Sequence, residues 1–108
     1  MKVTSAVARL SALAHESRLA VFRLLVQKGP GGLCVSELLA KLDISPATLS
    51  FHLKELTAAG LLKSRQEGRF IYYMPDFPAM NALLGYLTEN CCQGEPCAVE
   101  CAPRARRA

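Results

Sequence analysis

The stretch from Ser45 to Gly60 constrains the fold of this chain most strongly, because it marks both ends of one short helix. The Ser45 hydroxyl can accept from a backbone N–H of the first turn, and Pro46 suits the first helical position, where its missing N–H costs nothing. Gly60 can adopt the left-handed conformation that follows a last helical turn. An inward apolar stripe is expected at Leu49, Leu53 and Leu56.

The opposite face of this helix is small, hydroxylated and cationic, with one exposed aromatic ring. It carries Ala47, Thr48, Ser50, Phe51 and Lys54. Short side chains near a helix N-terminus permit close approach to base edges in the DNA major groove. Any amphipathic surface helix has a polar outer face, so this face alone does not distinguish a DNA-recognition helix from an ordinary surface helix. The neighbouring segments provide the distinction.

The residues before the capped helix predict three further helices. Apolar spacing indicates helices over residues 3–14 and 17–28, and on the second we expect Leu19 and Phe22 to face inward together with Leu25 and Val26. The run Gly-Pro-Gly-Gly ends that helix. A short third helix is expected over residues 36–42. Because it leads through a tight turn into the capped helix, the pair predicts a helix-turn-helix.

The period changes after Gly60, where two short strands are expected over residues 61–65 and 70–74. The turn between them is Gln66-Glu67-Gly68-Arg69. The hairpin as a whole carries three cations near its tip, Lys63, Arg65 and Arg69. The alternative is a solvated charged hairpin. A cationic β-ribbon directly after a helix-turn-helix instead predicts a winged helix whose wing contacts the phosphate backbone.

A last helix is expected over residues 76–90, with Met80, Leu83, Leu84 and Leu87 apolar. The first helix carries Val3, Val7, Leu10 and Leu13. Both have more apolar surface than so small a domain covers alone, which favours a homodimer through the first and last helices. The expected fold is therefore mainly α with a β-hairpin, a winged helix-turn-helix in the order α-α-α-α-β-β-α. Residues 1–90 would form this DNA-binding and dimerisation domain, followed by a tail over residues 91–108.

The net charge of +4 does not by itself indicate nucleic-acid binding, because three of the thirteen cations lie in the last five residues. Local placement of charge has to support that claim. No apolar stretch reaches transmembrane length, and polar residues interrupt any signal-peptide core, so we expect a cytoplasmic protein with no membrane partner and reduced thiols. We do not expect an enzyme, because the sequence shows no nucleophile–base pair, no phosphate-binding loop and no paired carboxylates.

Four of the five cysteines lie in the sequence CCQGEPCAVEC: Cys91, Cys92, Cys97 and Cys101. Thiols without histidine favour soft, thiophilic species. Trivalent arsenic or antimony would take three thiolates in a pyramidal arrangement. Zinc also suits the spacing of the last three cysteines, and a thiol redox switch is the third alternative. The single Cys34, near a helix start, is interpreted as a packing residue.

With these features together, the chain resembles the ArsR/SmtB family of metal-responsive repressors. The similar segments are Ala14–Leu19, Leu33–Leu38, Ser45–Leu53, Gly60–Leu62 and Gly68–Tyr73. The resemblance implies a homodimeric winged-helix repressor that binds double-stranded operator DNA and leaves it when a metal or metalloid binds.

Two familiar ligand sets of that family are incomplete here. Cys34 matches the first cysteine of a Cys-Val-Cys box, but Ser36 stands at the second. The last helix offers only Asp76 and Glu89, without a histidine. Branches of the family place an arsenic site after the last helix, which favours Cys91, Cys92 and Cys97 as ligands, with Cys101 as a substitute. The alternatives are a winged-helix interaction module with a zinc site and a thiol redox sensor.

Overall fold

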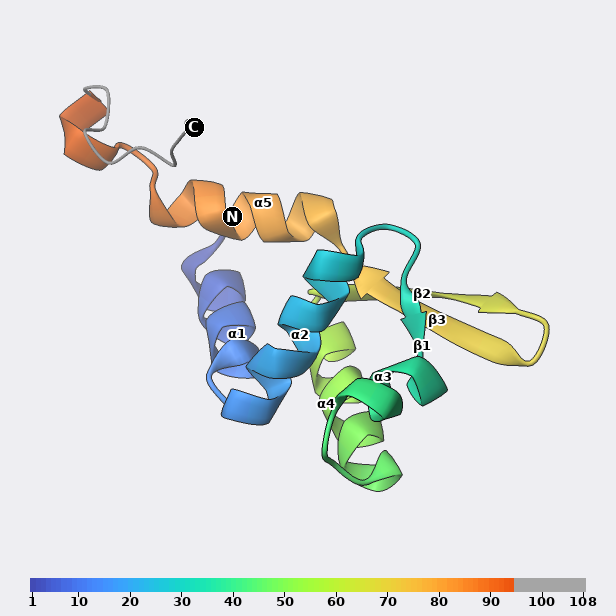
Figure 1. Ribbon diagram of the computed structural model, residues 1–108. Coiled ribbons are helices and arrows are strands. Elements are labelled where there is room, and N and C mark those ends of the chain that lie inside the picture. Colours follow the sequence, from blue (N-terminus) through green and yellow to red (C-terminus); the bar gives the residue numbers. More distant parts are fainter. Residues whose placement is uncertain (95–108) are drawn as a thin grey trace, which may run out of the picture.

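Five α-helices and a small antiparallel sheet make up residues 1–94, the part of the chain that this computed structural model describes (Figure 1). In chain order the elements are α1 (Val3–Leu13), α2 (Glu16–Lys28), β1 (Leu33–Cys34), α3 (Val35–Lys41), α4 (Pro46–Ala58), β2 (Leu62–Glu67), β3 (Phe70–Pro75), α5 (Phe77–Leu87) and the 3₁₀ turn η1 (Cys91–Gly94). The predicted order of helices and hairpin is confirmed, and the short strand β1 is added to it.

Local caps define both ends of α4. The Ser45 Oγ accepts from the backbone N–H of Thr48 at 3.1 Å, and Pro46 occupies the first helical position. Gly60 follows the helix with a φ of +84°, a left-handed conformation that glycine adopts without steric cost. These are the start and stop signals expected from the sequence.

The predicted stripe of α4 lies in the centre of the core. Leu49, Leu53 and Leu56 are fully buried, and they belong to one cluster with Val21 and Leu25 of α2. Leu38 of α3 and the two leucines after Gly60 complete its main part. Burying one such leucine side chain contributes about 1.5–3 kcal/mol. The core therefore fixes α4 against the rest of the helix-turn-helix.

The apolar residues of the outer helices divide into buried and exposed sets. Helix α1 packs inward through Ala6 and Ala12, so its larger apolar residues Val3, Val7 and Leu10 are exposed. On α5 only Leu83 is buried. The expectation for Leu19 was wrong: it is 43% exposed, because the buried line of α2 runs through Val21, Phe22 and Leu25.

The sheet has the order β1-β3-β2, with β3 in the centre. Leu33 and Cys34 lie opposite Tyr73 and Tyr72 of β3, which connects the start of α3 with the hairpin. Gly32 makes this approach possible, since it has a φ of +76° and a Cβ there would lie 2.6 Å from the Tyr73 carbonyl oxygen. A side chain at this position would push β1 away from β3.

The hairpin is longer and its turn tighter than predicted. Strands β2 and β3 pair from Leu62–Pro75 to Glu67–Phe70, which leaves a two-residue turn of Gly68 and Arg69. Gly68 has a φ of +62°. Such positive φ at the first turn position suits a tight hairpin.

Helix α5 ends at Leu87, three residues before the predicted end at residue 90. Asn90, Cys92 and Gln93 have positive φ values, so the chain turns sharply after the helix. The predicted boundary between domain and tail stays a prediction, since residues 95–108 lie outside the described part. No helix among residues 1–94 has both the length and the apolar character needed to cross a bilayer.

Candidate nucleic-acid interface and thiol segment

The outer face of α4 is exposed along its whole length. This holds for each of the five residues predicted there, Ala47, Thr48, Ser50, Phe51 and Lys54. The Phe51 ring is 53% exposed, although a large apolar side chain gains from burial. An exposed aromatic ring among small polar residues forms a surface that another molecule can contact.

Arg18, at the start of α2, contacts the Phe51 ring of this face. Its Nε donates to His52 Nδ1 at 3.3 Å, and its Nη1 donates to the Ala12 carbonyl at 3.4 Å. Its guanidinium carbon lies 5.6 Å from the centroid of the Phe51 ring, within the range of a cation–π contact. Sequence reasoning did not foresee this role, because the contact joins two helices that are distant along the chain.

His52 is buried at 3% exposure, next to the exposed Phe51. Burial lowers the pKa of its imidazole, and the nearby Arg18 and His15 lower that pKa further. The His15 ring centroid lies 4.9 Å from that of His52. The neutral ring can therefore accept from Arg18 at Nδ1, while Nε2 has no hydrogen-bond partner among the described residues. His52 therefore supports the exposed face of α4 from its buried side.

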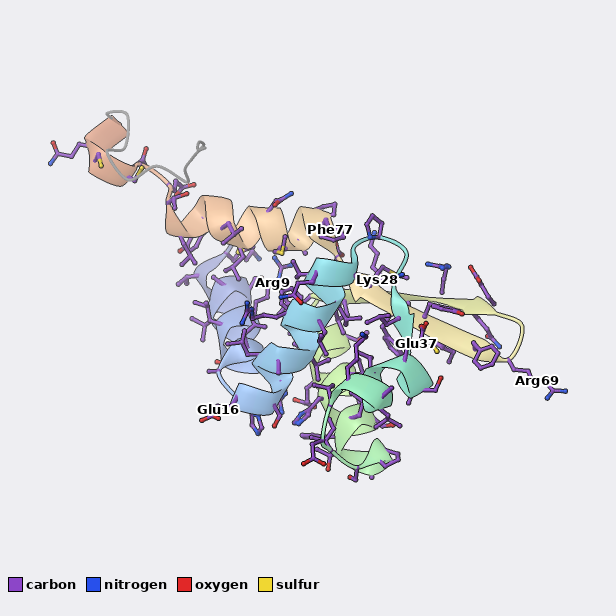
Figure 2. All side chains as sticks on the ribbon, viewed as in Figure 1. Arg9, Glu16, Lys28, Glu37, Arg69 and Phe77 are labelled. Carbon is purple, nitrogen blue, oxygen red and sulfur yellow. The ribbon has the colours of Figure 1, made fainter. Side chains whose placement is uncertain are left out.

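The wing presents its predicted cations in two different ways. Arg65 Nε donates to Glu67 Oε2 at 2.5 Å, and its guanidinium lies 5.0 Å from the Tyr72 ring centroid. Arg69 lies at the turn and projects away from the tip (Figure 2). Lys63 is exposed on β2. Arg65 is thus already engaged within the wing, whereas Arg69 extends outward from it.

A hollow joins α4 to the base of the wing. Ser50 and Lys54 line it from α4, and Ser64 and Tyr73 line it from β2 and β3. The hollow therefore makes the exposed face of α4 continuous with the hairpin. One molecule could contact both elements at once.

Cys34 is buried and caps α3. Its backbone N–H donates to Glu37 Oε1 at 3.0 Å, and its Sγ lies 3.2 Å from Ser36 Oγ. The hydrogen bond from the Cys34 backbone lowers the pKa of the Glu37 carboxyl, followed by that from its side chain. These contacts are those of a cap and a packed thiol.

The predicted thiol ligands divide at the edge of the described chain. Cys91 and Cys92 are exposed in η1, beyond the end of α5 that is farther from the wing (Figure 1). Cys97 and Cys101 lie outside the described residues. Among residues 1–94, no three His, Cys, Asp or Glu side chains gather to hold a metal ion. The four-cysteine site stays a prediction.

A helix-turn-helix with a small polar outer face, followed by a cationic hairpin, defines a DNA-binding protein of the winged-helix class. A family model described as a helix-turn-helix domain matches residues 13–65. A putative arsenical resistance operon repressor of Halobacterium salinarum is 42% identical over 64 residues, which are 59% of this chain and 49% of that protein. The chain thus spans about half the length of this relative.

A second relative is matched over more of its length. The arsenical resistance operon repressor of Bacillus subtilis is 33% identical over 78% of this chain and 76% of its own. An ArsR-like transcriptional regulator from Rhodococcus sp. RHA1 has a similar structure, with a TM-score of 0.69, 27% identity, and coverage of 78% of this chain and 76% of that chain. The chain belongs to the ArsR family of helix-turn-helix transcriptional regulators, which are DNA-binding proteins and not enzymes.

Proposed function

We propose that this chain is a homodimeric transcriptional repressor that leaves its operator when trivalent arsenic or antimony binds thiolates after α5. The observation that carries the proposal is the placement of the thiols. Cys91 and Cys92 are adjacent and exposed in η1, a few residues after α5, whereas the buried thiol of Cys34 lies at the end of β1, just before α3. Relatives named as arsenical resistance repressors support the inducer class.

Cys91, Cys92 and Cys97 are the proposed ligands, with Cys101 as a substitute. Three thiolates satisfy a trivalent metalloid, and neighbouring cysteines supply two of them without a long loop closure. Cys34 takes no part, because its sulfur contacts the Ser36 hydroxyl instead of a second thiol. The soft character of the donors excludes magnesium and calcium as inducers.

The DNA contacts follow from the exposed surfaces of α4 and the wing. Thr48, Ser50 and Phe51 on the outer face of α4 would read base edges in the major groove, and Ala47 and Lys54 lie on the same DNA-facing surface. Lys63, Arg65 and Arg69 would bind phosphates, which orients the protein without reading sequence. The hollow beside Lys54 lies between the two surfaces, so one half-site would contact both.

The proposed dimer closes over the exposed apolar residues of α1 and α5. Leu84 and Leu87 are 53% and 55% exposed, and Val3, Val7 and Leu10 of α1 are exposed as well. An apolar groove lined by Leu19, Phe22 and Leu83 adjoins Leu84. A second copy of the chain would remove this surface from water and would place two copies of α4 on a two-fold symmetric operator.

Induction requires the thiol segment and α4 to be coupled. A coupling free energy of about 1–3 kcal/mol between two sites is the usual size for allostery. Because linkage is reciprocal, operator DNA should weaken metalloid binding by the same factor by which the metalloid weakens operator binding. Cys91 follows α5 within a few residues, so closing a loop at the thiols would act on the proposed dimer helix.

The test is an operator-binding titration repeated with arsenite, antimonite, zinc, cadmium and peroxide. Serine variants of Cys91, Cys92 and Cys97 should bind operator as the wild type does but fail to release it with arsenite. Cys34→Ser is the matched control and should respond normally. Loss of the response in Cys34→Ser alone would move the inducer site to α3. Tightly held stoichiometric zinc, or release by peroxide without metal, would replace the proposal with one of the two alternatives.

A further inference from the structure

Arg9 of α1 donates hydrogen bonds to two other helices at once. Its Nε donates to the Ala59 carbonyl at 3.4 Å, and its Nη1 donates to the Ala79 carbonyl at 3.3 Å. Ala59 is the C-cap of α4, and Ala79 lies in the first turn of α5. Figure 2 shows Arg9 beside α5, on the side where α1 and α2 lie. Within residues 1–94, no other side chain bonds to both α4 and α5.

At α4 the Arg9 guanidinium lies where a cation is favoured. The last carbonyls of a helix lack intrahelical partners and carry partial negative charge. A Cβ on the next residue, Gly60, would lie 3.5 Å from Arg9 Nη2. Arg9 therefore packs against the chain where the recognition helix ends and the path to the wing begins.

At α5 the same guanidinium contacts a first turn that is already tied to this joint. The Asp76 Oδ1 accepts from the Ala79 N–H at 3.1 Å, which caps the helix. The Asp76 N–H donates to the Leu61 carbonyl at 2.8 Å. The start of α5 and the end of α4 thus meet at one place, and Arg9 spans both.

We propose that Arg9 is the residue that couples α5 to the recognition helix during induction. The proposal rests on the proposed function, in which the metalloid acts behind α5. A side-chain contact longer than about 3.5 Å is no longer a hydrogen bond, and the two bonds of Arg9, at 3.4 and 3.3 Å, are near that limit. A small shift of α5 against α4 would break one of them, and in this proposal the two-bond state belongs to the arrangement that binds operator.

The geometry of arginine suits this role better than that of lysine. A guanidinium presents several N–H groups in a rigid fork, so it can hold two carbonyls at a set separation. A lysine ammonium on its flexible stem follows one carbonyl when the other moves. Arg9→Lys therefore keeps the charge at the end of α4 but removes the requirement that both helices be in place.

The first test compares operator affinity with and without arsenite in the full chain. In the wild type we expect arsenite to weaken operator binding by roughly 5- to 150-fold, the usual range of coupling. We call the factor by which arsenite weakens operator binding the release factor. Arg9→Lys should keep operator affinity, melting temperature and arsenite affinity, while its release factor falls toward one. The control is Lys28→Arg at the end of α2, an exposed cation for which residues 1–94 provide no hydrogen bond; it should release as the wild type does.

A wild-type release factor in Arg9→Lys would overturn the proposal. So would a lower melting temperature and operator affinity at an unchanged release factor, which is the signature of a merely structural role. A second readout needs no inducer: operator DNA should slow amide exchange in the first turn of α5 in the wild type but not in Arg9→Lys. Equal protection in both chains would refute the coupling. A wild type that arsenite fails to release, with the exchange difference intact, would refute the proposed function alone.

Discussion

The guanidinium of Arg18 lies over the ring of Phe51, with 5.6 Å between its central carbon and the ring centroid. Phe51 is on the exposed face of α4, whereas Arg18 comes from the start of α2 and is anchored to the Ala12 carbonyl and to His52. The ring that we propose to read bases is therefore oriented by a residue outside the helix-turn-helix.

A double-mutant cycle on these two residues tests the orientation. Phe51→Ala should change which operator variants bind best, because one good base contact is worth ~1–3 kcal/mol of discrimination. Arg18→Met should shift the same preference by about 0.5–1 kcal/mol, the size of an exposed cation–π contact. Dissociation constants for a panel of operator variants provide the measurement. The double variant should match Phe51→Ala in its preference, because residues in contact are not additive.

The matched control is Phe70→Ala on β3, which removes an equally exposed ring outside α4 and should leave the ranking of operators unchanged. Equal weakening of all operators by Phe51→Ala would show that the ring reads no base. Additive effects of the two substitutions would show that Arg18 does not orient the Phe51 ring.

The wing makes a prediction about salt. Arg69→Ala should weaken binding to every sequence, and the slope of log affinity against log salt should become shallower by about 0.9 for one lost phosphate contact. Glu67→Gln should act in the opposite direction, because it releases Arg65 from its ion pair and removes a negative charge near the phosphates. Glu89→Gln, the same change beyond α5, serves as the control. Unchanged slopes in both wing variants would show that the hairpin does not touch DNA.

His52 predicts how stability depends on pH. Burial, followed by Arg18 and His15, lowers its pKa from the ordinary value of 6.5, so the unfolded chain takes up this proton at higher pH than the folded chain does. Its contribution to stability is fully present above pH 6.5 and is lost as pH falls from there through the lowered folded pKa. Denaturant unfolding between pH 7.5 and 5 measures this, with His52→Gln expected to flatten the dependence. An equally steep loss in His52→Gln would assign it to other groups.

The dimer prediction concerns the exposed apolar face of α5. Replacing Leu84 and Leu87 by glutamate should abolish dimerisation and reduce operator affinity together, because charges cannot be buried unpaired in an apolar interface. Sedimentation equilibrium and operator titrations measure the two effects. Ile71→Glu on β3, at a similarly exposed apolar residue, should stay dimeric. A doubly charged variant that remained a dimer would place the interface elsewhere.

The predictable part of the fold is the part that local chemistry determines. Ser45, Pro46 and Gly60 define α4 within one short stretch, and its leucine spacing identifies the buried face. Strand β1 was missed because a two-residue strand has no periodicity and pairs with a distant partner, Tyr72–Tyr73. Leu19 was placed inward because helical spacing alone does not show where a neighbouring helix ends its contact.

The candidate site also has one part that local sequence determines and another that depends on contacts between distant segments. Exposure of the α4 face could be predicted, since polar residues opposite a leucine stripe face outward. The roles of Arg9 and Arg18 could not, because each depends on how α1 or α2 packs against α4 and α5. That Cys97 and Cys101 contribute to a metalloid site stays a prediction from the sequence, because both lie outside the described residues.

The pairing of Cys34 with Tyr72 has a consequence for operator architecture. Since α3 begins at Val35, directly after that pair, the start of the helix-turn-helix is joined to the wing through the sheet. If both bind DNA as proposed, this connection keeps the distance between the α4 contacts and the wing contacts constant within each half-site. Adding a base pair inside a half-site would then break one of its two contacts, whereas changing the gap between half-sites would strain only the dimer. Operators of this regulator should therefore vary in the segment between the two half-sites, while the length of each half-site stays constant.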